Sequence, residues 1–267
     1  MAVPLVTLDH YQNKYETIRF ERRDGILQMT LHTNNGPYHM GGVQHSELVD
    51  AFVNIAGDHA NRIVILTGTG DAFCDGFDPT FEHDTGEELA RIHYEGRRIM
   101  QTVLDVEAPM IAAINGRMTS APPFALTCDI TLCSDNAAFS DRVHFTQHGT
   151  VPGDGVQVVW QYLLGPNRGR YFLLTGEEIS AQEALRLNVV NEVLPRDKLL
   201  ARAWELAEQL NTRSATTLRY ARLVLNQQYR KHMLEEVALG YGMQWLSMKT
   251  GPSAQQLAAE KQHPRDA

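Results

Sequence analysis

Apolar and polar residues alternate in two short runs near the N-terminus, at residues 18–22 and 26–31. Alternation with a period of two is typical of strands that have one buried face. The Asp24-Gly25 pair between the two runs favours a tight turn. These positions predict a β-hairpin, and a turn rich in Gly, Pro and Asn follows at residues 33–37.

Helical spacing replaces this alternation over residues 43–55, and Gly57-Asp58 ends the run. Residues 63–66 are then continuously apolar, which is typical of a strand buried on both faces. A strand, a helix and a second strand in this order predict a parallel β–α–β unit. The same order returns with a helix predicted over residues 87–104 and a strand over residues 109–114.

The rest of the chain predicts short strands and then mostly helices. Strands are expected at residues 128–133, 138–140 and 189–193. Ser180, followed three residues later by Glu183, is a capping box at the start of a helix. The helices that we expect span residues 156–164, 165–174, 180–187, 195–210, 214–229 and 231–249.

Composition predicts a globular α/β protein with a sizeable core. Of the 267 residues, 43% are hydrophobic and 21% are charged, and the formal net charge is −8. Because the chain is acidic and has no basic patch, we expect neither nucleic acid nor an anionic membrane surface as its partner. The N-terminal residues predict neither a signal peptide nor a membrane span.

Cysteine usage adds a prediction about the cellular environment. Cys74, Cys128 and Cys133 are an odd number and lack the spacing of a zinc site. They favour a reducing cytoplasm, and no metal is expected. Residues 251–267 are polar and lack periodicity, so we expect them to form a flexible tail.

Candidate chemistry gathers in the stretch 109–160. A polar loop carries Asp141, His144 and His148 towards Asp154, which lies between two glycines. A carboxylate and histidines delivered by loops at strand ends suit acid–base chemistry near neutral pH. Two plainer interpretations stay open: Asp154 as the cap of the following helix, and the histidines as ordinary loop residues.

Ordered motifs resemble those of the crotonase (enoyl-CoA hydratase/isomerase) superfamily. The segment Phe-Cys-Asp-Gly-Phe-Asp at 73–78 resembles its F-x-A-G-x-D motif, and later landmarks follow in the family's order at residues 112–116, 128–130, 151–153, 174–176, 179–184 and 189–195. The resemblance implies an α/β fold with a crotonase-type ββα spiral core over residues 1–195. It also implies a helical trimerisation region over residues 196–250.

The apolar residues of the last two predicted helices agree with such an assembly. They are more numerous than one domain needs to cover its own sheet, and comprise Leu218, Ala221, Leu225, Val237, Tyr241, Trp245 and Met248. Together with the resemblance, they predict a homotrimer or a hexamer built as a dimer of trimers.

The superfamily stabilises a thioester enolate with an oxyanion hole of two backbone N–H groups. The resemblance places one donor at Asp75, and Phe77 of the same motif is a candidate substrate contact. The second donor normally lies in a glycine run after Asn-Gly, but residues 119–123 read Thr-Ser-Ala-Pro-Pro, and proline has no N–H.

The two glutamates of the hydratases are also replaced. Alignment places Pro123 at the first, and Val143 or His144 at the second. Hydration of an enoyl thioester has therefore lost its acid and its base, so we do not expect a simple enoyl-CoA hydratase.

The chain resembles more closely the β-diketone hydrolase (6-oxocamphor hydrolase-like) branch of the superfamily. The matching stretches lie at residues 12–16, 32–33, 63–70, 152–155, 159–160 and 169–175. These enzymes cleave a C–C bond between two carbonyls with water and without CoA, so no cofactor is expected. The resemblance implies catalytic roles for His45, His144 and Asp154, with His144 oriented by Asp154 and deprotonating water. His45 lies on a helical pattern, where an exposed or structural role is the alternative.

Three departures from that branch bear on substrate binding. Met40 stands where the branch has tryptophan, Gln244 where it has glutamate, and Ala121 nearest to a histidine that polarises a substrate carbonyl. His148 lies in a loop that is one residue longer. Either His148 takes over the lost role, or the substrate differs.

These observations leave three hypotheses for a small-molecule substrate. The first is a CoA-independent hydrolase that cleaves a C–C bond of a cyclic β-diketone. The second is a CoA-thioester isomerase, hydratase or hydrolase with Asp154 as its base. The third is a catalytically altered paralogue, which the two prolines at 122–123 support.

Overall fold

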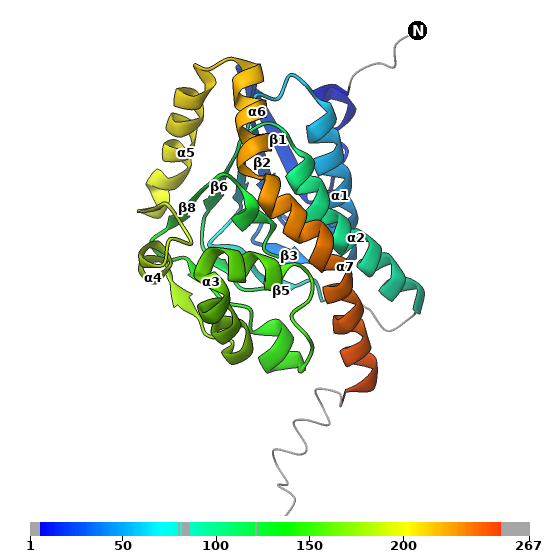
Figure 1. The fold of residues 1–267 in the computed structure, drawn as a ribbon. Coiled ribbons are helices and arrows are strands. Elements are labelled where there is room, and N and C mark those ends of the chain that lie inside the picture. The colour runs from blue at the N-terminus through cyan, green and yellow to red at the C-terminus, as the bar shows by residue number, and fades with distance from the viewer. Residues whose placement is uncertain (1–5, 80, 82–85, 121, 252–267) are drawn as a thin grey trace, which may run out of the picture.

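The computed structural model describes residues 6–79, 81, 86–120 and 122–251. Two β-sheets form its centre and helices pack around them (Figure 1). Ala121 and, except for Gly251, the expected tail lie outside the described residues.

The larger sheet has six strands in the order β1-β2-β4-β6-β8-β11. Only the pair β1–β2 is antiparallel, and the other neighbours are parallel. Asp24 and Gly25 take φ values of 50° and 80°, which confirms the predicted hairpin turn. The strands are β1 (Ile18–Arg23), β2 (Ile26–Leu31), β4 (Ile63–Gly68), β6 (Met110–Ile114), β8 (Ile130–Ser134) and β11 (Glu192–Leu194).

Strand β4 is buried on both faces, as its continuous apolar pattern predicts. Ile63 and Ile65 belong to a smaller core beneath helix α5 (Arg196–Asn211), and Val64 and Leu66 belong to the main core on the other face. Because α5 and the main core cover opposite faces, the sheet needs apolar residues at successive positions.

The smaller sheet has the order β10-β9-β7-β5-β3, and it is parallel except at the pair β10–β9. Only β9 was predicted. The others are short or contain turn-like residues, so their pattern does not reveal pairing that forms between distant segments. The strands are β3 (Tyr38–Met40), β5 (Ala72–Phe77), β7 (Arg117–Met118), β9 (Ala138–Phe139) and β10 (Ile179–Ser180).

Helices surround the two sheets, with α1 beside α2 and α7 running across the front of the molecule (Figure 1). Helix α3 is kinked at Gly165, where φ is 77° and Pro166 follows. The kink agrees with the prediction of two separate helices over residues 156–164 and 165–174. The remaining helices are η1 (Leu8–His10), α1 (Gly42–Gly57), α2 (Gly86–Asp105), η2 (Phe124–Thr127), the π-helix η3 (Val143–His148), α3 (Val156–Thr175), α4 (Ala181–Arg186), α6 (Ala215–Leu225) and α7 (Gln227–Thr250).

Three local predictions were wrong in detail. The last strand of the larger sheet is Glu192–Leu194 rather than residues 189–193, because the Val189 N–H bonds back to helix α4. The last two helices meet at Asn226 rather than near residue 230, since its side-chain amide is held by Asp129. The capping box is one-sided: Ser180 accepts from the Glu183 N–H, while the Glu183 carboxylate pairs with Arg186.

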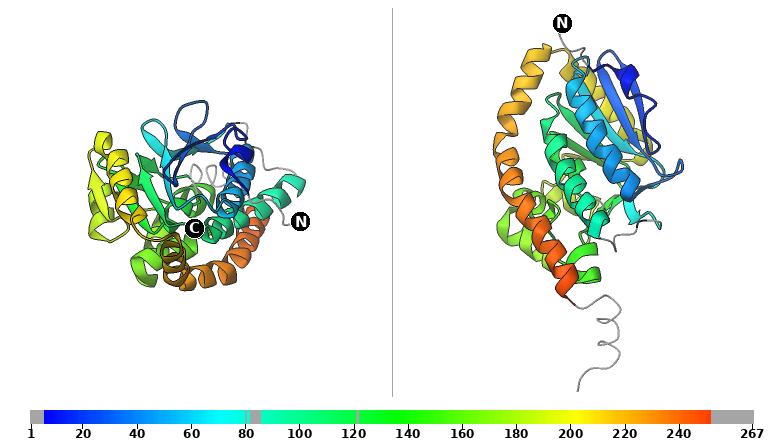
Figure 2. Two further views of the ribbon diagram at one scale, coloured as in Figure 1. Left: turned by 90° about the horizontal axis from the view of Figure 1, so that it is seen from above. Right: turned by 90° about the vertical axis from the view of Figure 1, so that its right-hand side faces the viewer.

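Helices α6 and α7 form a long flank along one side of the molecule, clearest in the right view of Figure 2. Arg222, only 2% exposed, anchors α6 to the chain's own core. Its guanidinium donates to the carbonyl oxygens of Val106, at 2.6 Å, and Val103, at 3.2 Å, and pairs with the Asp129 carboxylate. The contacts made by these buried donors fix the flank against the main core.

The flank buries some of the apolar residues that we expected at a subunit contact. Leu218, Val237 and Tyr241 are buried within the chain, so these three side chains do not add to its apolar surface. Other apolar side chains of α6 and α7 are exposed instead, namely Tyr220, Val224, Leu225, Leu234, Leu239, Met243 and Leu246.

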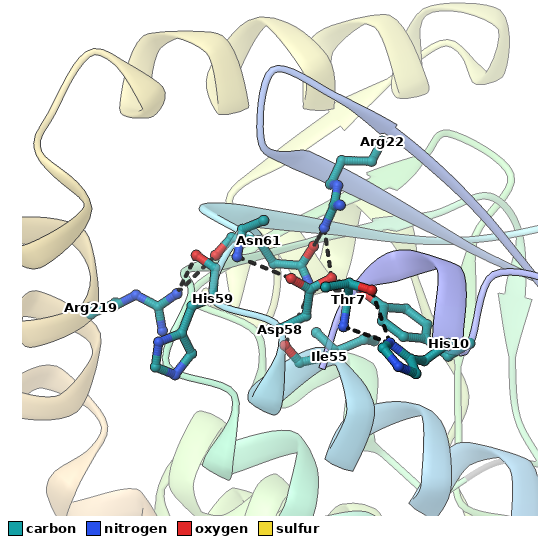
Figure 3. A network of polar contacts seen from close by, with 10 residues as sticks. Thr7, His10, Arg22, Ile55, Asp58, His59, Asn61 and Arg219 are labelled. Carbon is teal, nitrogen blue, oxygen red and sulfur yellow. Dashed lines mark hydrogen bonds and ion pairs between the residues drawn. The ribbon is translucent and has the colours of Figure 1, made fainter. Parts of the chain in front are cut away.

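A buried polar network ties the N-terminal segment to the end of α1 (Figure 3). Asp58 is 2% exposed and accepts from the Tyr11 hydroxyl at 3.0 Å and from Arg22 at 2.7 Å. Asn61 donates to the Tyr11 oxygen at 2.9 Å, and Arg219 of α6 donates to the Asn61 carbonyl at 3.2 Å. Asp58 is therefore held by groups that donate hydrogen bonds to it, the Tyr11 hydroxyl and the Arg22 guanidinium.

Among the described residues, no helix combines the length and the apolar character needed to cross a bilayer.

Candidate active site

A cavity of about 220 Å³ lies where the loop between β9 and α3 meets helices α1, α2 and α7. Most of its wall is apolar, with Met40, Phe77, Phe81, Ile92 and Met248 among the lining side chains. A largely apolar cavity with polar groups gathered at one end is a usual form of a small-molecule site.

His144 lies at the polar end of this cavity between two carboxylates. Its Nδ1–H donates to Asp141 Oδ1 at 2.6 Å, and its Nε2 lies 3.4 Å from Asp154 Oδ2. All three side chains are at most 10% exposed. The π-helix η3 begins two residues after Asp141, so the i, i+3 spacing turns Asp141 and His144 towards each other.

The charges of this group are strongly coupled. Burial alone would lower the pKa of His144, but the carboxylates of Asp154 and Asp141 outweigh it and raise that pKa well above its ordinary value. Burial would likewise raise the pKa of Asp154, but His144 outweighs it and lowers that pKa. Burial raises the pKa of Asp141 despite its contact with His144. The imidazole is therefore a stronger base than free histidine.

The two oxygens of Asp154 have separate tasks. Oδ1 accepts from the Val156 N–H at 3.3 Å, at the start of α3, while Oδ2 faces His144. Both interpretations of this residue, as a helix-end acceptor and as an acid–base group, therefore describe part of its environment. Gly155, with a φ of 110°, takes a conformation that favours glycine and turns the chain into α3.

His45 of α1 is buried and lines the cavity. Its Nδ1–H donates to the Gly41 carbonyl at 2.8 Å, and its ring stacks on Phe81. Burial lowers the pKa of His45 to about 4, so the ring is neutral at pH 7 and its Nε2 carries a lone pair. The structure therefore excludes an exposed position for His45 and leaves a structural role as the alternative to catalysis.

The other candidate residues divide into three groups. Met40, Phe77, His148 and Gln244, which are candidate substrate-binding residues, line the cavity. The Asp75 side chain is not among the lining groups; it is exposed, and its carboxylate lies 3.9 Å from His39. Ala121 lies outside the described residues.

Sequence reasoning missed the roles of two residues at this site. Asp141 was noted only as part of a polar loop, although its spacing of three from His144 was a readable signal. Tyr241 was counted only among the apolar residues of the last two predicted helices, yet it lines the cavity. The glycines on either side of it, Gly240 and Gly242, are unusual in a helix interior and were the available signal.

The His144–Asp154 pair can activate a water molecule on its cavity side. With His144 neutral and its Nδ1–H held by Asp141, a water can donate one O–H to Nε2 and the other to Asp154 Oδ2. The pair can later return the proton taken from water. This is the requirement of hydrolysis with general acid–base catalysis.

The comparisons with known proteins agree with the fold and with an enzyme site. The family model of enoyl-CoA hydratase/isomerase matches residues 21–263. The chain belongs to this family. It has a crotonase fold, with a mixed α/β core and C-terminal helices.

Curated relatives of this crotonase-family enzyme carry CoA-linked names. The hydroxycinnamoyl-CoA hydratase-lyase of Pseudomonas fluorescens is 28% identical over 219 residues, 79% of each chain. The carnitinyl-CoA dehydratase of Citrobacter koseri is 31% identical over 197 residues, 73% of this chain and 74% of the relative.

Solved structures include a β-diketone hydrolase from the cyanobacterium Anabaena, bound to (S)-3-oxocyclohexyl acetic acid. It is 40% identical to this chain, with a TM-score of 0.87, and the match covers 93% of this chain and 98% of that one. An enoyl-CoA hydratase/isomerase from Mycobacterium paratuberculosis shares the fold at 23% identity, with a TM-score of 0.84 and coverage of 92% and 99%.

Proposed function

We propose that this crotonase-family enzyme hydrolyses a C–C bond of a cyclic β-diketone by a retro-Claisen reaction, without CoA or another cofactor. The observation that carries the proposal is the Asp141–His144–Asp154 group at the polar end of an apolar cavity. The similarity to the Anabaena β-diketone hydrolase supports the same reaction class.

The reaction begins with a water molecule beside His144 and Asp154. One O–H proton passes to His144, and the hydroxide oxygen bonds to one substrate carbonyl carbon. The C–C bond to the carbon between the two carbonyls then breaks, and its electron pair forms the enolate of the other carbonyl. His144 returns the proton to that carbon, so one water is added and the product is a keto acid.

The test is mass spectrometry of the purified protein incubated with a panel of cyclic 1,3-diketones. We expect a product heavier than its substrate by one water, formed by the wild type and lost in Asp154→Asn. Absence of this product across the panel would contradict the proposal.

The alternative function is chemistry on a CoA thioester, as an isomerase, hydratase or hydrolase. The observation that favours it is the CoA-linked activity in the names of the curated relatives. Equilibrium binding of CoA thioesters at micromolar concentrations, together with no diketone turnover, would select this alternative. Failure of both assays would select the catalytically altered paralogue.

We further propose a homotrimer or a dimer of trimers. The exposed apolar side chains of α6 and α7 support a contact with a second copy, with Leu234 at 57% and Leu239 at 67% exposure. Light scattering should give a trimer or hexamer mass for the wild type and a smaller species for Leu234→Asp with Leu239→Asp. A monomeric wild type at micromolar concentration would refute the assembly. A cytoplasmic location remains a prediction, supported by three free thiols.

A further inference from the structure

Tyr241 is a buried residue on the cavity wall, and its side chain carries a polar hydroxyl. The residue is 2% exposed and lines the cavity, and its hydroxyl has no hydrogen-bond partner among the described residues. A buried tyrosine hydroxyl normally finds a partner, because leaving it unpaired costs free energy. A group of this kind is suited to a ligand that supplies the missing acceptor.

Two glycines bring Tyr241 to the acid–base group. Gly153 precedes Asp154 and Gly240 precedes Tyr241, and the two backbones touch where α7 crosses the loop. A Cβ added at Gly153 would lie 2.1 Å from the Gly240 carbonyl oxygen, and one added at Gly240 would lie 2.4 Å from the Gly153 oxygen. No side chain fits between them, so the contact sets the position of Tyr241 relative to Asp154.

A third glycine and a histidine fix the phenol ring. A Cβ added at Gly96 of α2 would lie 1.9 Å from the Tyr241 oxygen, so the hydroxyl occupies space that only glycine leaves open. The His93 ring packs edge-on to Tyr241, with centroids 5.7 Å apart and an angle of 85° between the planes. Glycine in a helix interior is costly, and here it makes room for one oxygen.

We propose that Tyr241 donates a hydrogen bond to the substrate carbonyl that becomes the enolate when the C–C bond breaks. This inference rests on the proposed diketone hydrolysis, because that reaction develops negative charge on an oxygen away from the attacked carbon. A fixed donor aimed at such an oxygen stabilises the transition state. Tyr241 would thus fill the role that the sequence leaves vacant at Ala121.

Two other polar groups of the wall, on His45 and Trp245, suit this task less well. Neutral His45 presents a lone pair at Nε2 and cannot donate from that atom. The Trp245 Nε1 atom also has no partner in the part of the chain that the structure describes, but it is fully enclosed. Burial raises the pKa of Tyr241 well above its ordinary value, with the Asp154 charge acting in the same direction, so the hydroxyl keeps its proton at neutral and mildly alkaline pH.

The test compares Tyr241→Phe with a matched variant on the same helix, Tyr229→Phe. Tyr229 is also buried, and its hydroxyl also has no hydrogen-bond partner within the described ranges, but it does not line the cavity. We expect Tyr241→Phe to lower kcat for a cyclic 1,3-diketone about 100-fold, the usual effect of removing one oxyanion donor, and Tyr229→Phe to leave it unchanged. Equal kcat in Tyr241→Phe and the wild type would overturn the proposal.

A second measurement separates this inference from the proposed reaction. Cyclohexanone labelled with ¹³C at its carbonyl cannot undergo retro-Claisen cleavage, so its bound NMR signal reports the hydrogen bond without turnover. We expect a downfield shift on binding to the wild type and to Tyr229→Phe, and its loss in Tyr241→Phe. If the shift behaves in this way but no diketone is turned over, Tyr241 is a hydrogen-bond donor to a carbonyl and the proposed reaction is wrong.

Two further variants test the position of the hydroxyl. Gly96→Ala should displace the Tyr241 oxygen and abolish the same shift, although the phenol is still present. Ser120→Ala removes another hydroxyl of the cavity wall and should leave the shift intact. A shift that is lost in Ser120→Ala and kept in Tyr241→Phe, or one that is absent from the wild type, would overturn the proposal.

Discussion

Two buried aspartates in this protein differ in whether their hydrogen-bond partners can exchange a proton. Asp58, 2% exposed, is held by the Tyr11 hydroxyl at 3.0 Å, Arg22 at 2.7 Å and the Ala60 N–H at 3.0 Å. Asp154, 7% exposed, has the Val156 N–H at 3.3 Å and His144 at 3.4 Å. The hydrogen bonds to Asp58 are shorter and more numerous than those to Asp154, and all of them come from donors. Figure 3 shows the network around Asp58.

The difference shows what separates a structural carboxylate from a chemical one. Arginine, tyrosine and backbone amides keep their protons at physiological pH, so the hydrogen bonds to Asp58 stabilise the fold without offering a proton for transfer. The partner of Asp154 is an imidazole whose proton can leave, and the pair opens on a cavity. Burial of a carboxylate therefore says little about function until the partner is known.

The largest effect should come from Asp154→Asn. Asparagine keeps an oxygen for the Val156 N–H but cannot take part in proton transfer, so we expect diketone turnover to fall at least about 1,000-fold with little change in Tm. Turnover assays and thermal melts measure the two quantities. A large drop in Tm with unchanged specific activity would show that Asp154, like Asp58, has a structural role and no role in proton transfer.

A smaller loss is expected for Asp141→Asn, about 100-fold in turnover, because His144 loses its orienting acceptor. The base is neutral His144, so wild-type activity should rise with pH through a pKa above 6.5. Removing the Asp141 charge lowers that pKa and moves the rise to lower pH. The exposed Asp135→Asn is the control, and a pH–rate midpoint that stays at the wild-type value in Asp141→Asn would contradict this role.

Asp58→Asn should act on stability alone. We expect the free energy of unfolding to fall by about 1–3 kcal/mol, because Arg22 and Tyr11 lose a charged acceptor. Urea denaturation measures this change, and turnover per folded molecule should match the wild type. Glu235→Gln breaks only an exposed pair with Lys231 and should change stability by less than about 1 kcal/mol.

The smallest effect concerns His45, whose pKa of about 4 lies below the ordinary 6.5. Between these values the unfolded chain binds the proton and the folded chain does not, so the folded state loses stability as pH falls from 6.5 towards 4. His32 and His93 contribute in the same direction. The dependence of Tm on pH should therefore be less steep in His45→Gln than in the wild type, and equal slopes would contradict a neutral buried His45.

Much of the fold could be predicted because periodic apolar patterns report burial locally. The hairpin at β1–β2 and the two-faced strand β4 follow from residues within a few positions of each other. Strands β3, β7 and β10 could not be predicted, because two or three residues carry no period and pair only with distant segments. Helix ends such as Asn226 depended on a side-chain bond to Asp129 from far along the chain.

The candidate site likewise has features that the sequence determined and features that only the tertiary structure decided. The sequence alone determined that His144 and Asp154 lie near glycines in one loop, and that His45 matches a family position, since these are properties of residue type and order. Only the tertiary structure decided that Asp141 holds His144, that His45 is neutral, and that Tyr241 faces the cavity. Hydrogen bonds, burial and charge coupling act over a few ångströms in space, whereas Tyr241 lies far from Asp154 along the chain.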